Sequence, residues 1–434
     1  MNRDKNIRYE KQRARMRRRK RERRMYMLTA VFASLCVFAF IGLILQIKGG
    51  VTTEPGTWIV ESGEVQVAAP PMDDSGRAAG GAVVIETPAP AILDFLPIVE
   101  PTAAPDSSDI PAIEPEQQLA TITISAAGDA TLGGDYNTSA HERFDSYAEK
   151  HGYAYFLENV RDIFEQDDLT FVNLEGPLTT STDKRGGRIF NFKGAPAYAN
   201  ILALGSVELA GLANNHALDF GRSGLEETVE SLSAAGVEAC GYQLVYRDVI
   251  NGISVTCMSV TEWDYTTDEL KEMIARERGD CDLLIMMIHW GEERAYQPTD
   301  SQMKYGYAMI DAGADLVLGS HSHVVGGIER YAGKYIVYGL GNFCFGGNSN
   351  PSDKDAMIFQ QTFALDPDAG ILDAGIAIVP ISVSSVSGTN DYRPTPLTGS
   401  EATRVLKKIG GYSLVQMDQI RWSRGMDEYL ALGN

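Results

Sequence analysis

Cysteine and histidine are both scarce in this chain, whose 434 residues include five cysteines and six histidines. The cysteines nowhere form a CxxC pair, which argues against a zinc ribbon. One of them, Cys36, lies in a long apolar run; Cys257, Cys281 and Cys344 fall in expected strands, and Cys240 lies between an expected helix and an expected strand. These four could form disulfides, but we expect buried free thiols, since free cysteine is among the most buried residue types.

Positive charge is scarce outside the N-terminus. The whole chain has a formal charge of −20, while residues 1–24 hold 13 Lys and Arg against 3 Asp and Glu, a local charge of +10. The remaining 410 residues therefore carry −20 − 10 = −30. Such an acidic region repels polyanions at long range, so we expect no nucleic-acid partner, although cations can concentrate near it. The split also predicts two environments for the two parts.

Charged residues are absent from residues 25–47, which read "MYMLTAVFASLCVFAFIGLILQI". About 20 apolar residues suffice to span a bilayer as a helix. A cleaved signal peptide is the alternative, but its apolar core is shorter and ends in a small-residue cleavage site, which this run lacks. The basic residues 1–24 precede the run, so we expect them to stay cytoplasmic. The expectation is a single-pass protein of the cell membrane with an extracellular C-terminal domain.

Residues 48–118 resemble a stalk more than a domain. Ten of the 18 prolines lie between Pro55 and Pro115, mixed with Ala, Thr, Glu and Asp. Proline-rich chain of this kind is extended and resists packing. We therefore expect an extracellular linker over residues 48–118 and a globular domain over residues 119–434.

The globular part alternates between strand and helix patterns. Strands are expected at 121–129, 168–176, 207–215, 253–260, 281–291, 314–323, 334–345, 355–365 and 370–383, and helices at 155–166, 195–205, 223–236, 267–279 and 300–313. In the helix at 223–236, Ser223 is a candidate N-cap and Gly236 a candidate C-terminal stop. Strands that alternate with helices and then follow one another predict an α/β sandwich with mixed sheets.

Polar side chains gather where five of these expected strands end. The segments are "SAAGDATLGGD" with Asp129, "FVNLEGPL" with Asn173 and Glu175, "GLANNHALDFG" with Asn214, Asn215, His216 and Asp219, "IMMIHWGEE" with His289 and Glu292, and "VLGSHSHV" with His321 and His323. Ligands of open α/β sheets bind beyond the carboxyl ends of the strands. Four of the six histidines could therefore meet at one edge, whereas His141 and His151 are expected at the surface.

Imidazole and carboxylate groups together suit zinc, manganese or iron. The set is large enough for one or two divalent ions, and two ions that share a bridging carboxylate can activate water and stabilise charge on a phosphoryl oxygen. In an extended H-x-H segment, His321 and His323 would face the same side. Each motif alone has a structural alternative: a polar turn at His321, a core histidine at His289, a helix cap at Glu175. Their shared position at strand ends favours one metal site.

The ordered motifs "GDATLGG", "NLEGPL", "LANNHALDFG", "HWGEE", "GSHSHV" and "YGLGNFCF" resemble those of the capsule synthesis protein CapA family. This family of poly-γ-glutamate capsule biosynthesis proteins is a branch of the calcineurin-like metallophosphoesterases. The resemblance extends over roughly 121–350 and implies a four-layer αββα sandwich, metallophosphoesterase-like, with the site at the sheet ends. The basic tail and single expected membrane span also resemble the anchored members of the family.

Matched to these motifs, the metal ligands implied by the resemblance are Asp129, Glu175, Asn215, His289, His321 and His323. His216 would contact a substrate phosphate or donate a proton, and Asp219 would orient it. The wider superfamily has Asp-x-His as its first motif, whereas this chain has Thr131 at the third position. Its second motif has Asp followed by Arg, whereas this chain has Glu175 in "NLEG".

Two functions follow as expectations. The first is a metal-dependent hydrolase that acts on a phosphoester or on an amide bond of a cell-surface polymer. The second is a non-catalytic, anchored component of a polymer synthesis or export complex, with other capsule proteins as partners. An anionic polymer would have to meet metal ions or a basic segment such as "TDKRGGR", with Lys184, Arg185 and Arg188; that segment is otherwise a solvated loop.

Overall fold

The computed structural model describes residues 119–414. The expected basic tail at 1–24, membrane helix at 25–47 and linker at 48–118 lie outside the described residues. Among the helices within 119–414, none has the length and apolar character needed to cross a membrane.

The first of two large sheets has eight strands in the order β16-β15-β14-β1-β3-β5-β6, and β13 pairs with β1. The strands β1, β3, β5, β6 and β13 pair in parallel, whereas β14, β15 and β16 pair antiparallel. Their bounds are β1 Ala120–Thr131, β3 Leu169–Leu174, β5 Leu209–Gly211, β6 Glu238–Cys240, β13 Asn342–Phe345, β14 Asp355–Asp366, β15 Gly370–Ser382 and β16 Thr395–Pro396.

The second sheet has six strands in the order β11-β12-β10-β9-β8-β7. Its middle strands run parallel, and β7 and β11 close the two edges antiparallel. The bounds are β7 Tyr246–Ile250, β8 Ile253–Thr261, β9 Leu283–His289, β10 Leu316–Ser320, β11 Ile328–Tyr331 and β12 Lys334–Val337. A small third sheet pairs β2 Gly134–Asp135 with β4 Phe192–Lys193.

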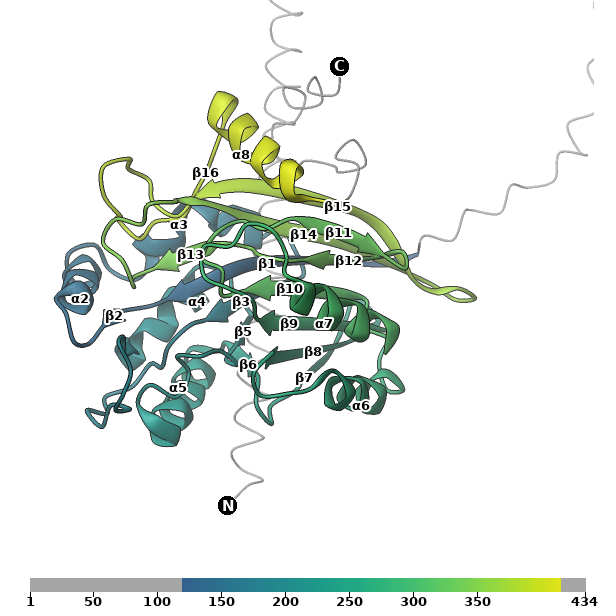
Figure 1. Cartoon of the computed structure of the whole chain (residues 1–434), viewed down its shortest axis with the longest axis horizontal. Helices are drawn as coiled ribbons and strands as arrows, with labels where there is room; N and C mark the ends of the chain where they lie inside the picture. The colour runs from purple at the N-terminus through teal and green to yellow at the C-terminus, as the bar shows by residue number, and fades with distance from the viewer. Residues whose placement is uncertain (1–118, 415–434) are drawn as a thin grey trace, which may run out of the picture. The chain divides into compact units, whose positions relative to one another are not determined.

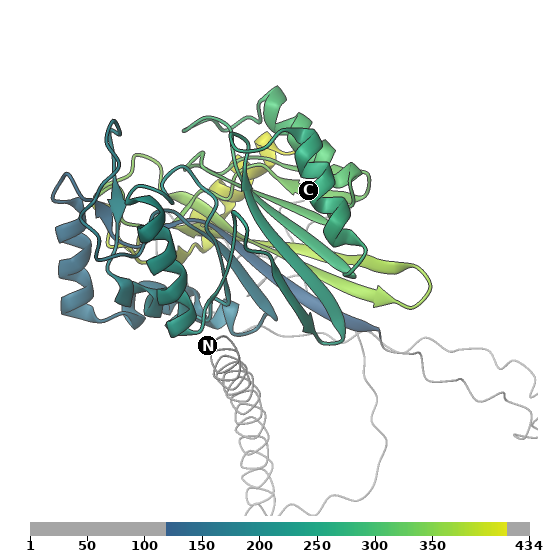
Figure 2. The ribbon, with the colours of Figure 1, turned by 90° about the horizontal axis from the view of Figure 1, so that it is seen from below.

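Helices lie on the outer sides of the two sheets (Figures 1 and 2). Those that pack on the eight-stranded sheet are α2 Ala140–His151, α3 Ala154–Phe164, α4 Ala199–Leu204, which follows the short 3-10 helix η2 Pro196–Tyr198, and α5 Gly221–Ala235. The six-stranded sheet is covered by α6 Thr267–Arg278 and α7 Asp300–Asp311. A last helix, α8 Gly399–Tyr412, lies along β15 (Figure 1) and adds Val405, Leu406 and Ile409 to the core between the sheets.

Alternation along the strands builds the layers. In β9, Leu283, Ile285 and Met287 belong to the core between the sheets. Their neighbours Leu284, Met286 and Ile288 belong to the core under α6 and α7. Because successive strand side chains point to opposite faces, one continuous apolar run supplies both cores. The result is a mixed α/β structure with several sheets, consistent with the expected metallophosphoesterase-like fold.

The structure differs from several element-level expectations. Helices α2 and α8 were not expected from the apolar pattern. The expected strand at 334–345 is two strands in different sheets, because the chain crosses over between β12 and β13. Ser223 lies inside α5, which begins at Gly221, whereas Gly236 ends that helix in the left-handed region at φ 84° as expected.

The cysteine expectation is met within residues 119–414. Cys240, Cys257 and Cys344 are buried free thiols, and Cys281 is a half-buried one. His151 is exposed, as expected for a surface residue. The side chain of His141 lies outside the described residues.

Candidate metal centre

Asp129 lies in β1 at an irregular point of its pairing with β3. The register runs from Ala127 opposite Val172 directly to Asp129 opposite Asn173, so Gly128 is an extra residue. Such a bulge changes the face on which the following side chain lies. Only a glycine fits there, because a Cβ on Gly128 would lie 1.8 Å from the carbonyl oxygen of Gly341. The strand continues two residues beyond its expected end at Asp129, to Thr131.

Glu175 directly follows β3 and is buried. Its backbone N–H donates to the carbonyl oxygen of Ala130 at 3.0 Å, which ties it to β1. The Thr131 hydroxyl donates to Glu175 Oε2 at 3.4 Å. Thr131 and Glu175, the two positions where the motifs were expected to differ from Asp-x-His and Asp-Arg, therefore contact each other.

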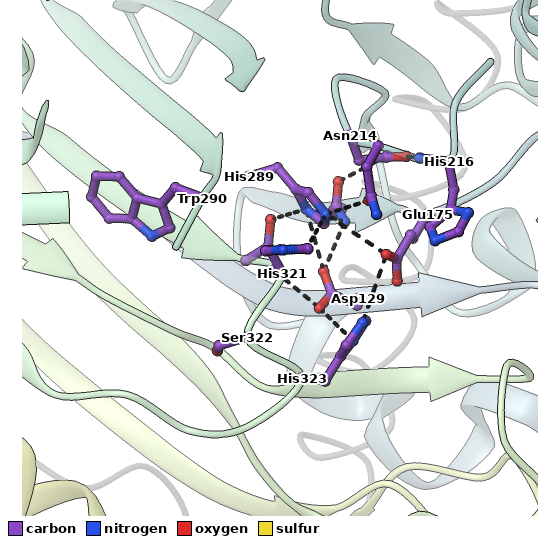
Figure 3. Close-up of polar contacts among 12 residues, drawn as sticks. Asp129, Glu175, Asn214, His216, His289, Trp290, His321, Ser322 and His323 are labelled. Atoms are coloured by element: carbon purple, nitrogen blue, oxygen red, sulfur yellow. Dashed lines mark hydrogen bonds and ion pairs between the residues drawn. The ribbon is translucent and has the colours of Figure 1, made fainter. Parts of the chain in front are cut away.

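His289, the last residue of β9, lies at the centre of the cluster (Figure 3). Its Nδ1 is 2.8 Å from Ser320 Oγ, a contact across the β9–β10 pair. Its Nε2 is 2.9 Å from Asn215 Oδ1, 3.1 Å from His321 Nδ1 and 3.7 Å from Glu175 Oε1. Potential ligand atoms from three separate segments thus surround His289 Nε2.

The two histidines of the H-x-H motif reach the cluster from a loop and not from an extended strand. Strand β10 ends at Ser320, and His321 and His323 have φ values of 91° and 57°. Positive φ is strained for residues other than glycine, and such strain persists only where the surroundings hold it. The His321 backbone N–H donates to Asp129 Oδ2 at 3.2 Å, and Asn342 Nδ2 donates to the His323 carbonyl oxygen at 3.1 Å. The expectation of an extended segment was wrong, although both rings lie in the same site.

Two groups of potential ligand atoms result. Glu175, His289 and His321 form one, and Asp129, Glu175 and His323 form the other; within each group the ligand atoms lie within 4.8 Å of one another. Glu175 belongs to both. Its Oε1 is buried without a hydrogen-bond partner, and it lies 3.7 Å from His289 Nε2 and 3.9 Å from His323 Nε2. An unpartnered buried carboxylate oxygen facing imidazole nitrogens fits a cation site. We call the six residues Asp129, Glu175, Asn215, His289, His321 and His323 the metal pocket.

The electrostatics of the metal pocket follow from burial and mutual charge. Burial lowers the pKa of His289 well below its usual range and the pKa of His321 to about 4, so both rings are neutral, the form that binds metals. Burial also raises the pKa of Glu175 to about 7, against the opposing charge of His323. Burial alone would lower the pKa of His323, but the carboxylates of Glu175 and Asp129 outweigh it and raise this pKa to about 10.

His216 and Asp219 form a separate pair beside the metal pocket. His216 Nδ1 is 2.6 Å from Asp219 Oδ2, and the same oxygen accepts the Phe192 N–H at 2.7 Å. The ring of Phe192 lies 4.1 Å from the His216 ring. Figure 3 shows His216 next to Glu175. Asp219 thus holds His216 as expected, and the catalytic role of this pair stays a prediction.

Several residues that shape the site were not assigned by sequence. Asn173 donates to Asp129 Oδ1 at 2.8 Å and accepts from Asn214 Nδ2 at 3.2 Å. Asn342, the first residue of β13 in the motif "YGLGNFCF", lies 2.9 Å from His323 Nδ1 through its Oδ1. Trp263, half exposed, stands edge-on to His321 with ring centroids 4.9 Å apart. Asn173 was expected at the end of its strand but without a role, whereas nothing in the sequence marks Trp263.

Comparison with known proteins gives a consistent picture. The chain is 26% identical to "Capsule biosynthesis protein CapA" of Bacillus anthracis over 315 residues, 64% of this chain and 72% of that protein. It is 27% identical to "PGA biosynthesis protein CapA" of Bacillus subtilis (strain 168) over 248 residues, 52% of this chain and 63% of that protein. It is 28% identical to "Probable polyglutamine synthesis accessory protein Rv0574c" of Mycobacterium tuberculosis over 209 residues, 40% of this chain and 55% of that protein.

The matched region coincides with the site. The family model described as bacterial capsule synthesis protein PGA_cap matches residues 123–347, more than half of the 434 residues. That span contains every residue of the metal pocket together with His216 and Asp219. The chain therefore belongs to the PGA_cap family of bacterial capsule synthesis proteins.

Proposed function

We propose that this protein acts in the synthesis of poly-γ-glutamate or a related capsule polymer as a metal-dependent hydrolase of the metallophosphoesterase type. Family membership and the names of the Bacillus relatives support the capsule role. The observation that carries the hydrolase role is Glu175 Oε1, an unpartnered buried oxygen common to both ligand groups. We further propose that residues 25–47 anchor the chain in the cell membrane with residues 119–434 outside.

The metal pocket would hold one or two divalent ions of manganese, zinc or iron. Carboxylate, imidazole and amide donors together suit these metals. Glu175, His289, His321 and Asn215 would hold one ion, and Asp129, Glu175 and His323 the other. Bound ions of this kind activate water and polarise a phosphoryl or carbonyl oxygen.

The chain's own residues orient and protect the reacting groups. Asp219 accepts the Nδ1 proton of His216, which leaves Nε2 of that ring as the atom that exchanges a proton with the leaving group. Phe192, Phe345 and Trp263 lie against His216, His323 and His321 and limit water at the rings. A proton donor fixed by a carboxylate beside a polar pocket is suited to hydrolysis of an ester or amide.

A non-catalytic role is the second candidate, and one observation favours it. Thr131 and Glu175 replace residues that the superfamily uses at its metal centre, so the pocket departs from that of an ordinary phosphomonoesterase. In this alternative the metal pocket stabilises an anchored component of a polymer synthesis or export complex.

The test is turnover by the purified full-length chain with added Mn²⁺ or Zn²⁺, measured on chromogenic phosphodiesters and on poly-γ-glutamate. We expect metal-dependent turnover that falls by at least about 100-fold in His289→Ala and in His321→Ala, because each change removes a ligand. His151→Ala, an exposed histidine outside the pocket, is the matched control. Bound metal without turnover on either substrate would support the non-catalytic role instead.

A further inference from the structure

A second charged feature adjoins the metal pocket. Residues 181–191, which we call the basic loop, read "STDKRGGRIFN" and lead into β4. Three cationic side chains against one acidic residue make this segment an exception in a region that carries −30.

The basic loop is fastened at two points to the residue that holds His216. The Arg185 backbone N–H donates to the Asp219 carbonyl oxygen at 2.6 Å, and the Phe192 N–H donates to Asp219 Oδ2 at 2.7 Å. Asn191 is fixed by its own N–H, which donates to Asp135 Oδ1 at 3.0 Å. The loop therefore leaves and rejoins the fold at the edge of the site, and its position is set by these bonds.

The guanidinium groups of the basic loop are not consumed by internal ion pairs. Six arginines of the described chain pair with carboxylates: Arg161, Arg247, Arg278, Arg330, Arg393 and Arg404. Within residues 119–414, neither Arg185, which is exposed, nor Arg188, which is half-buried, has such a partner. These two cations are therefore available to an external anion.

The charges of Arg185 and Arg188 act on Tyr242, whose hydroxyl donates to the Asn214 carbonyl oxygen at 3.5 Å. Burial raises the pKa of Tyr242 to about 12, and the charges of Arg185 and Arg188 oppose that rise. Asn214 immediately precedes Asn215 of the metal pocket. The charge of the basic loop is thus felt next to the segment that supplies a candidate ligand.

We propose that Arg185 and Arg188 form a subsite for carboxylate groups of an anionic polymer whose adjacent bond enters the metal pocket. The inference rests on the proposed function, because it assigns the substrate class of the same site. Guanidinium binds carboxylate through paired, charge-assisted hydrogen bonds. A chain with a free carboxylate on every unit, such as poly-γ-glutamate, could engage both arginines at once, against the repulsion of the acidic surface around them.

A membrane surface is the competing partner for this loop. Ile189 and Phe190 are 84% and 52% exposed, and apolar side chains beside basic ones also suit a lipid interface. The two hydrogen bonds to Asp219 favour the polymer, because they hold the backbone of the basic loop at Arg185 and at Phe192 beside the residue that contacts His216.

The test is binding of the full-length chain to fluorescently labelled poly-γ-glutamate, measured by anisotropy with metal and again with chelator. We expect Arg185→Ala/Arg188→Ala to raise the apparent Kd for the polymer at least about tenfold, both with metal and with chelator. Arg185→Lys/Arg188→Lys, which keeps the charge, should recover part of the binding. Lys271→Ala/Arg276→Ala, the same loss of charge on α6, is the control and should stay within about twofold.

The outcomes separate the subsite from the metal-dependent activity. Arginine-dependent binding that persists with chelator supports the subsite even if no turnover is found. Unchanged polymer binding in the double alanine variant overturns the subsite. An equal loss of binding in the α6 control overturns it as well, and so does binding of a polymer with esterified carboxylates as tightly as the free acid. If the double alanine variant lost binding to anionic phospholipid vesicles but kept its binding to the polymer, the basic loop would instead be a membrane-binding segment.

Discussion

Glu175 is the residue on which the metal pocket depends most. Its backbone is tied to β1 and its Oε2 accepts from Thr131, so its position is set by β1 and not only by its own strand. Its Oε1 faces His289 and His323, which come from different sheets or loops. The Glu175 carboxylate is thus fixed by residues of β1 on one side and faces the two imidazole rings on the other.

At the same scale, we predict that Asp219→Asn lowers kcat by about 10- to 100-fold and leaves the metal content near that of the wild type. The amide still reaches His216 Nδ1 but no longer offers a carboxylate to fix the tautomer and stabilise the imidazolium. Steady-state kinetics and metal analysis on the same preparation measure both quantities. An equal loss of metal and activity would show that Asp219 acts through the fold of the pocket instead.

Sequence indicated the chemistry of individual residues better than their partners. Asp129, His289 and His321 could be selected because each lies near the end of an apolar strand. Asn173 and Asn342 acquire their roles only through strand register, which places Asn173 opposite Asp129 and Asn342 beside His323. Register depends on pairings between segments far apart in the chain, and periodicity within one segment does not contain it.

At the scale of elements, irregular backbone orients candidate ligand side chains that a regular strand would direct elsewhere. The bulge at Gly128 aims Asp129, and the left-handed φ values of His321 and His323 turn both rings into the site after β10 has ended. Alternating apolar patterns indicated most of the strands and five of the helices. They did not reveal the crossover between β12 and β13, because both strands are apolar and only the four residues 338–341 connect the two sheets at that point.

For the bulge, we predict that Gly128→Ala destabilises the protein by about 3 kcal/mol or more, since the new Cβ would meet backbone 1.8 Å away. Metal affinity should fall with it, because Asp129 is displaced. Gly186→Ala is the matched control: a Cβ there has no neighbour within 4 Å, so stability should stay within about 0.5 kcal/mol of the wild type. Urea unfolding followed by circular dichroism measures both. Equal stability of the two variants would refute the role assigned to Gly128.

At the scale of the whole molecule, the two sheets meet where their parallel strands end, and the site draws on both. Asp129 and Glu175 come from the eight-stranded sheet, and His289 and His321 from the six-stranded one. The α/β class and the mixed sheets followed from the order of patterns along the chain. Helix α8 was not expected, although Ala402, Val405, Leu406 and Ile409 have the i, i+3, i+4, i+7 spacing of an amphipathic helix.

The most direct test of the account is anomalous X-ray scattering from crystals of the protein grown with Mn²⁺. We predict one or two strong anomalous peaks at Glu175, each about 2.0–2.3 Å from a carboxylate oxygen and from imidazole nitrogens of the metal pocket. Glu175→Gln crystals should show these peaks weakened or lost, whereas Glu226→Gln, an exposed glutamate on α5, should keep them. A wild-type map with no anomalous peak at Glu175, or with peaks only at surface carboxylates, would contradict the central claim.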